Sequence, residues 1–314
     1  MYLIKLLRPL NLAIIAITMY GLGWFLEFYT NQLGEIKSSS FLLLVLSTVM
    51  IAGAGNIIND YFDVRADRVN KPEKLIIGKH VKRRTAIASH WIINFVSFGI
   101  AVYLSWKFNT FWYLFIHLLT INLLWYYSTY FKKKFLIGNL LVAGMTALVP
   151  ILVGFYFYHI LQINDIELEG AAYSSIEKFA GLKQIIGSIA LFALLINLAR
   201  EIVKDIEDVE GDKILKSKSI PIVLGARKSK SIIVVIILIT VSLLSTILVL
   251  YNSVMFTLLP LALISLLLLI IAMTLIILAK NKKEFRRVNN CLKLAMIAGI
   301  LLPIYFRFFT EITI

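Results

Sequence analysis

The sequence has one cysteine, Cys291, and four histidines among its 314 residues. A single cysteine excludes an internal disulfide. Together with histidines that fall at no ligand-like spacing, it also excludes zinc and iron–sulfur sites. Charged residues are scarce at 16%, against roughly 25% in an ordinary soluble domain, whereas hydrophobic residues make up 60%. These scarcities exclude an ordinary soluble protein and indicate a chain that is embedded in a lipid bilayer.

Nine apolar runs are each long enough to cross about 30 Å of hydrocarbon as a helix. The first run is too long for a signal peptide and lacks a cleavage site, so we expect a retained helix. The sequence therefore predicts an all-α integral membrane protein that forms one polytopic domain over residues 1–314, with an external loop at 159–183. The nine predicted spans are 10–30, 41–60, 86–106, 111–130, 136–158, 184–203, 231–251, 254–279 and 288–309.

Basic residues outnumber acidic residues by 32 to 18, which gives a net charge of +14. Most of them lie in alternate loops, and the opposite loops hold only Lys37, Lys107, Lys178 and Lys183. Because Lys and Arg favour cytoplasmic loops, we predict a cell-membrane protein with a cytoplasmic N-terminus and an external C-terminus. Positive charge beside membrane spans on one leaflet indicates attraction to anionic lipid, so we expect the bilayer, and no nucleic acid, as a partner.

Six of the seven aspartates lie in two short segments on the predicted cytoplasmic side. The pattern D-x-x-D-x-x-x-D occurs in both, at a fixed offset of 145 residues. If a helix continues through such a segment, its three carboxylates fall within about 60° of arc and share one face. Each copy follows the second helix of a four-helix block, which predicts two four-helix repeats plus a ninth helix, with the acidic faces meeting across a central cavity. The aspartates are Asp60, Asp63 and Asp67 in the first copy, and Asp205, Asp208 and Asp212 in the second.

Clustered carboxylates at a membrane boundary repel one another and require cations. Oxygen ligands without His or Cys favour Mg²⁺, which completes its octahedron with water and phosphate oxygens. Basic residues interleaved with the aspartates are candidate contacts for a diphosphate. They are Arg65, Arg68, Lys71 and Lys74 in the first segment and Lys204 and Lys213 in the second.

Two other interpretations compete with a lipid-diphosphate site. A charged segment beside a span is most often a solvated cap with salt bridges, but the second copy argues against this. An ion-coupled transporter would also place carboxylates in a helical bundle, usually near the bilayer midplane and in broken helices. Here the aspartates lie at the ends of the predicted spans.

Four segments resemble the UbiA superfamily of intramembrane prenyltransferases. They are residues 7–11, with Arg8; residues 59–67, followed by Lys71-Pro72; Tyr127-Ser128 with Lys132-Lys133 and Gly138-Asn139; and residues 200–212, followed by Pro221 and Gly225. The resemblance implies a nine-helix fold around a cavity open to the cytoplasm, and Mg²⁺-dependent transfer of a prenyl group from its diphosphate to a lipophilic acceptor.

The resemblance also implies roles for individual residues. Asn59 and the first three aspartates would hold one metal ion, and the second three aspartates the other. Substrate binding is expected at Asn59, Tyr127, Lys132 and Arg200, with Tyr127 facing the allylic cation. Lys74-Leu75 and Ile77-Gly78 stand where many relatives have Arg-Pro and Ser-Gly.

Two acceptor classes fit the amino-acid sequence of the second motif. One is a prenylglyceryl phosphate, as in archaeal-type enzymes, and the other is an aromatic quinone precursor such as homogentisate, hydroxybenzoate or dihydroxynaphthoate. We favour geranylgeranylglyceryl phosphate with geranylgeranyl diphosphate as donor, because residues 204–208 and 59–63 look closest to that group. Lys213 or Lys216 would then hold the acceptor phosphate, although simple attraction to anionic lipid also explains these lysines.

Overall fold

The computed structural model describes residues 2–166, 172–214, 216–250 and 259–313. Within these ranges the chain is almost entirely helical, which confirms the predicted all-α class. The helices are α1 (Tyr2–Leu7), α2 (Pro9–Thr30), α3 (Ser39–Asn70), α4 (Arg83–Lys107), α5 (Trp112–Thr129), α6 (Ile137–Ile166), α7 (Ala172–Ile214), α8 (Ile220–Leu250), α10 (Leu259–Leu278) and α11 (Lys282–Thr313). Three short 3₁₀ turns connect some of them, namely η1 (Glu35–Lys37), η2 (Pro72–Lys74) and η3 (Phe131–Lys133).

Eight helices in the described ranges are long and apolar enough to cross a membrane. They coincide with eight of the nine predicted spans, and the remaining one, 111–130, corresponds to α5. This helix has 18 residues, or about 27 Å, which is near the lower limit for a span. Its polar and aromatic residues, such as His117 and Asn122, keep its mean hydropathy below that of the most apolar stretches of the eight span candidates.

The external loop predicted over 159–183 is wrong for most of its length. Helix α6 continues to Ile166 and α7 begins at Ala172, while residues 167–171 lie outside the described part. The apolar run ends near 158, but the following Glu, Lys, Leu and Ala residues are good helix formers. Hydropathy therefore marked the edge of the hydrocarbon and not the end of the helix.

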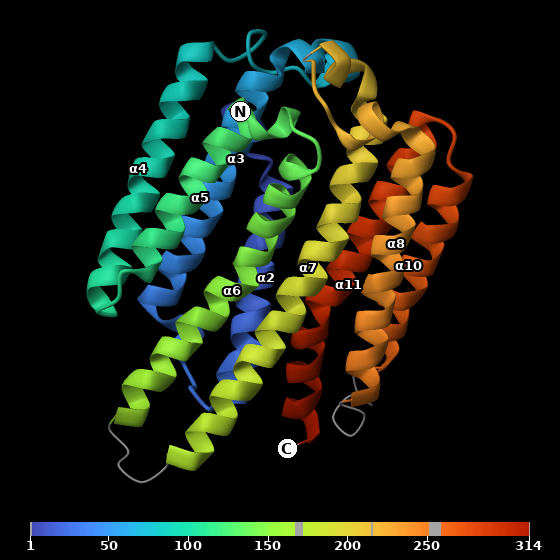
Figure 1. Ribbon diagram of the computed structural model, residues 1–314. Coiled ribbons are helices and arrows are strands. Elements are labelled where there is room, and N and C mark those ends of the chain that lie inside the picture. Colours follow the sequence, from blue (N-terminus) through green and yellow to red (C-terminus); the bar gives the residue numbers. More distant parts are fainter. Residues whose placement is uncertain (1, 167–171, 215, 251–258, 314) are drawn as a thin grey trace. The chain divides into compact units, whose positions relative to one another are not determined.

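The chain divides into two compact units. The first comprises residues 1–17, 37–141 and 208–219, and the second comprises residues 18–36, 142–207 and 220–314. In the first unit α3, α4 and α5 pack side by side, and in the second α10 packs against α8 and α11 (Figure 1). These units do not follow the predicted four-helix blocks, because most of α2 belongs to the second. The internal repeat and the single polytopic domain stay predictions.

A buried apolar cluster in the first unit holds α1 and the turn after η2 against α3. Leu6 of α1, Ile57 and Val64 of α3, and Ile77 and Val81 of the turn all lie in it. Burying one such side chain contributes about 1.5–3 kcal/mol. The cluster therefore fixes the segments around the C-terminal end of α3, which carries the first aspartate motif.

Helix α3 is longer than the hydrocarbon layer of a membrane is thick. It begins after Ser38, whose hydroxyl accepts a hydrogen bond from the Phe41 amide at 3.1 Å, and continues for 32 residues, about 48 Å. It ends at Asn70, since Lys71 precedes Pro72 and adopts φ −149°, outside the helical region. The last turns of α3 thus project beyond about 30 Å of hydrocarbon as a helix, as the sequence predicted.

Candidate active site

The first aspartate motif occupies one face of the last turns of α3. Asp63 is the most enclosed of the three, with only 6% of its surface exposed. The Asn59 side-chain amide, one helical turn earlier, donates a hydrogen bond to the Asp63 carboxylate at 2.8 Å. A spacing of three or four residues puts these side chains next to one another. The motif is therefore an ordered cluster of oxygen atoms on a single helix.

Lys132 of η3 brings a positive charge into this cluster. Its ammonium group forms an ion pair with the Asp63 carboxylate and lies 3.5 Å from the Asn59 carbonyl oxygen. It also interacts electrostatically with Tyr127 and Asp212. Burial is the largest single influence on Lys132 and opposes its charge, but Asp63 together with the other nearby groups outweighs burial and raises the pKa of the ammonium group. Lys132 therefore stays protonated at neutral pH and links the two aspartate motifs.

The end of α7 meets the end of α3 through a set of close polar contacts. The side-chain Nδ2 of Asn70 donates a hydrogen bond to the backbone carbonyl of Asp208 at 3.1 Å. The side-chain Oδ1 of Asn70 accepts a hydrogen bond from the backbone N–H of Gly211 at 3.0 Å. The Lys71 ammonium lies 2.7 Å from the Asp208 carboxylate. A Cβ on residue 211 would stand 2.2 Å from the Asn70 side-chain nitrogen. Only glycine therefore permits this approach, which holds Asp212 near Asp63 and Lys132.

Arg8 is a further basic residue that contacts an aspartate of the first motif. It occupies the break between α1 and α2 with φ 56°, and Pro9 starts the next helix. Its guanidinium forms an ion pair with Asp60. The Asn56 amide anchors the same break by donating to the Leu7 carbonyl at 3.0 Å. Each of Asp60, Asp63 and Asp208 thus contacts one basic side chain.

Comparison with known proteins agrees with this arrangement. Residues 12–297 match the UbiA prenyltransferase family. The chain belongs to this family. A digeranylgeranylglyceryl phosphate synthase from Thermococcus gammatolerans is 35% identical over 198 residues, which cover 63% of this chain and 62% of that protein. The synthase from Methanosphaera stadtmanae is 28% identical over 94% of both chains. The aligned part thus spans about three fifths of the first relative and nearly all of the second.

Solved structures show that the fold is that of UbiA membrane proteins. One structure, from a study of digeranylgeranylglyceryl phosphate synthase in membranes, has a TM-score of 0.65 and 24% identity and covers 98% of this chain and 97% of that one. A UbiA homolog from Archaeoglobus fulgidus bound to GPP and Mg²⁺ has a TM-score of 0.56 and 16% identity, with 96% and 99% coverage. This protein is therefore a multi-pass membrane protein.

Several predicted site residues are described apart from this cluster. Arg200, Lys204 and Asp205 belong to the second unit. There Arg200 donates to Asn289 at 3.2 Å and to Asn197 at 3.1 Å, and Lys204 pairs with Glu201. Lys213 is exposed at the end of α7. The side chain of Lys74 lies outside the described part of the structure.

Arg65 and Arg68 do not lie on the same face of α3 as the aspartates. At about 100° per residue they point about 170° and about 105° away from the mean direction of the three carboxylates. The helical period alone could have separated them from the acidic face. Conversely, Arg8, Asn70 and Gly211 were not among the predicted site residues, although Arg8 and Gly211 stand in segments that carry the family resemblance and Asn70 directly precedes Lys71-Pro72. Only the resemblance of these segments to the family could have indicated their role. Local sequence patterns do not predict a contact over 141 residues, such as the one between Asn70 and Gly211.

The donor set suits a hard divalent cation. All the candidate ligands supply carboxylate or amide oxygen, which is the chemistry that Mg²⁺ prefers. Within the described ranges, no three acidic, His or Cys side chains converge closely enough to hold an ion by themselves.

Proposed function

We propose that this protein transfers a prenyl group from geranylgeranyl diphosphate to the free hydroxyl of geranylgeranylglyceryl phosphate in a Mg²⁺-dependent reaction. The observation that carries the proposal is the cluster of Asp63, Lys132 and Asp212, in which a partly exposed lysine pairs with Asp63 and lies within electrostatic range of Asp212 of the second motif. Support for the acceptor comes from the relatives named as digeranylgeranylglyceryl phosphate synthases. Support for the metal comes from the A. fulgidus homolog bound to GPP and Mg²⁺.

Two sets of residues are proposed to hold the metal ions. The first set is Asn59, Asp60, Asp63 and Asp67, and the second is Asp205, Asp208 and Asp212. Bound Mg²⁺ would neutralise the diphosphate and make it a better leaving group.

The basic side chains on the aspartates are proposed to act on the leaving diphosphate. Lys132 and Lys71 already lie against Asp63 and Asp208, so they are poised to donate charged hydrogen bonds to its oxygens. The allylic carbon–oxygen bond breaks, the acceptor hydroxyl oxygen bonds to that carbon and loses its proton to solvent, and an ether and inorganic diphosphate result. Tyr127, which interacts with Lys132, is proposed to face the allylic carbon with its ring.

The site is proposed to open to the cytoplasm, with the N-terminus on the same side and the C-terminus outside. The charge asymmetry of the loops supports this orientation. Soluble diphosphate would then be released to the cytoplasm, while the prenyl chains remain within the apolar bundle.

Purified enzyme in lipid nanodiscs tests the function. It is supplied with geranylgeranyl diphosphate, Mg²⁺ and a mixture of geranylgeranylglyceryl phosphate, homogentisate, hydroxybenzoate and dihydroxynaphthoate, and the products are identified by mass spectrometry. We expect the glyceryl phosphate ether with equimolar diphosphate release. A prenylated aromatic product would show that the acceptor is an aromatic compound and not the glyceryl phosphate. Absence of diphosphate release with every acceptor would contradict prenyl transfer.

Substitutions in the two motifs test the site itself. Asp63→Asn and Asp208→Asn each remove a ligand charge and should lower kcat at least a hundredfold at saturating Mg²⁺, since charge stabilisation of this kind contributes about 10²–10³. Glu73→Gln is the matched control, because Glu73 is exposed in η2 and outside both motifs. Activity equal to that of the control in both aspartate variants would refute the proposed metal sites.

A further inference from the structure

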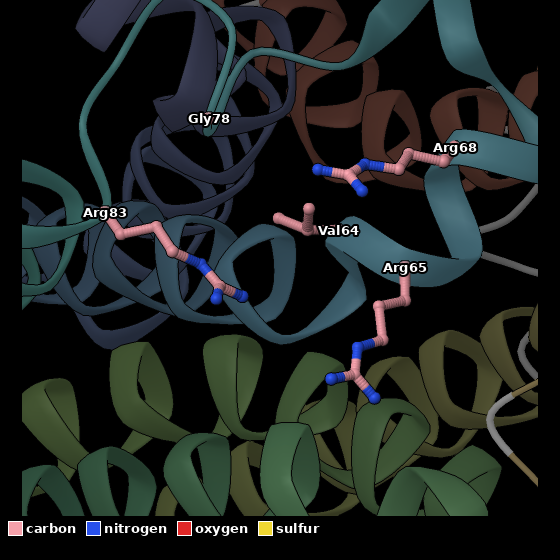
Figure 2. A pocket seen from close by; sticks show the side chains of 5 residues that line it. All are labelled: Val64, Arg65, Arg68, Gly78 and Arg83. Atoms are coloured by element: carbon pink, nitrogen blue, oxygen red, sulfur yellow. The ribbon is translucent and has the colours of Figure 1, made fainter.

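A cavity on another side of α3 is lined by three arginines. This partly open cavity of about 160 Å³ is lined by Arg65 and Arg68 of α3, Arg83 at the start of α4, Val64 and Gly78. Figure 2 shows these five residues. All five residues belong to the first unit. The cavity lies well around the helix from the aspartate face, so it is separate from the candidate active site.

The arginines of this cavity lack the carboxylate partners that basic residues have in the active site. Within the described ranges Arg65 and Arg68 form no ion pair or hydrogen bond. Arg83 contacts Tyr61, whose carbonyl lies 3.5 Å from the guanidinium and whose ring centre lies 5.0 Å from it. Three like charges around one cavity repel one another, and a bound anion would remove that repulsion.

The shape and chemistry of the cavity suit a phosphate group. Its volume of about 160 Å³ leaves room for a phosphate group. Guanidinium groups bind phosphate oxygens through paired hydrogen bonds. Val64 belongs to the buried cluster beneath, which gives the cavity a fixed apolar floor. Gly78 closes one side with φ 86°, a conformation that favours glycine.

The cavity lies at the depth of lipid head groups. The part of α4 after Arg83 exposes Trp91, Ile92 and Phe95, by 55%, 64% and 78%. Exposed tryptophan marks the membrane interface, and the apolar residues after it face hydrocarbon. Arg83 precedes Trp91 by eight residues, or about 12 Å of helix, which places it outside the hydrocarbon.

We propose that this cavity binds the phosphate head group of an anionic bilayer lipid. The acceptor of the proposed reaction also carries a phosphate, but only the glycerol carbons separate it from the reacting hydroxyl. A helix with its side chains is about 10–12 Å wide, so a phosphate held by Arg65 is too far around α3 for that hydroxyl to reach the aspartate face. A lipid of the surrounding bilayer has no such constraint, and its chains can lie along the exposed face of α4.

Native mass spectrometry of the full-length protein in detergent, titrated with phosphatidylglycerol, tests the proposal without relying on catalysis. We expect Arg65→Gln with Arg68→Gln, and separately Arg83→Gln, to weaken binding about tenfold or more, because a charged hydrogen bond contributes about 1.5–3 kcal/mol. Arg84→Gln is the matched control, since Arg84 is exposed beside Arg83 but does not line the cavity. It should bind as the wild type does.

Three outcomes would overturn the proposal. An equal loss in Arg84→Gln would mean diffuse surface attraction, and displacement of phosphatidylglycerol by millimolar inorganic phosphate would assign the cavity to a soluble anion. A raised KM for the acceptor with unchanged phosphatidylglycerol binding would assign it to the acceptor. If the glutamine variants do not fold, Arg65→Lys keeps the charge but loses the paired donors, and it should still weaken lipid binding.

Discussion

Replacing Lys132 by glutamine should destabilise the protein more than any other single loss of surface charge in the first unit. The substitution leaves the Asp63 carboxylate, which is 6% exposed, without its positive partner. Breaking a fully buried pair costs about 3–5 kcal/mol, and here the cost is lower because the Lys132 side chain is 27% exposed. The Asn59 amide still donates to Asp63, so we expect the lower end, about 3 kcal/mol. At roughly 2 °C per kcal/mol for a chain of this size, Tm should fall by about 6 °C.

The assay is thermal unfolding in one detergent, with Lys133→Gln as the matched control. Lys133 is the neighbouring lysine, is exposed, and should cost less than about 0.5 kcal/mol when replaced. Asp63→Asn combined with Lys132→Gln should be more stable than Lys132→Gln alone, because the double variant has no buried carboxylate left unpaired. Added Mg²⁺ should narrow the deficit of Lys132→Gln, since Asp63 then gains a cation. Equal melting of the two lysine variants would refute the reasoning.

Two further predictions concern the junction of α3 with α7 and the orientation in the membrane. Gly211→Ala should lower stability by about 1–3 kcal/mol through its clash with Asn70, and Asn70→Ala in the same chain should recover part of that loss in thermal unfolding. If the second substitution only adds to the loss, the clash is not the cause. Single cysteines on the proposed cytoplasmic face should react with an impermeant maleimide only after that face is exposed, whereas labelling in intact cells would reverse the orientation. The variants are Lys79→Cys, Lys133→Cys and Lys216→Cys, each in a Cys291→Ser background.

The sequence alone determined where the chain is helical and apolar, and where its carboxylates share a face. Both properties are local, because a span needs only about 20 consecutive apolar residues and a helical face follows from 100° per residue. The spacing of Asp60, Asp63 and Asp67 was therefore enough to place them together. The same local reasoning failed over 159–183, because hydropathy reports contact with hydrocarbon and not the helical backbone.

Only the tertiary structure decided which charges meet. Lys132 reaches Asp63 across 69 residues and Lys71 reaches Asp208 across 137, and both contacts depend on how distant helices pack. Sequence proximity suggested instead that Arg65 and Arg68 would serve the aspartates. The helical backbone turns them away into their own cavity, because residues two or five positions apart do not share a helix face. The helical period thus determines which carboxylates share a face, whereas the packing of distant segments determines which basic residues contact them.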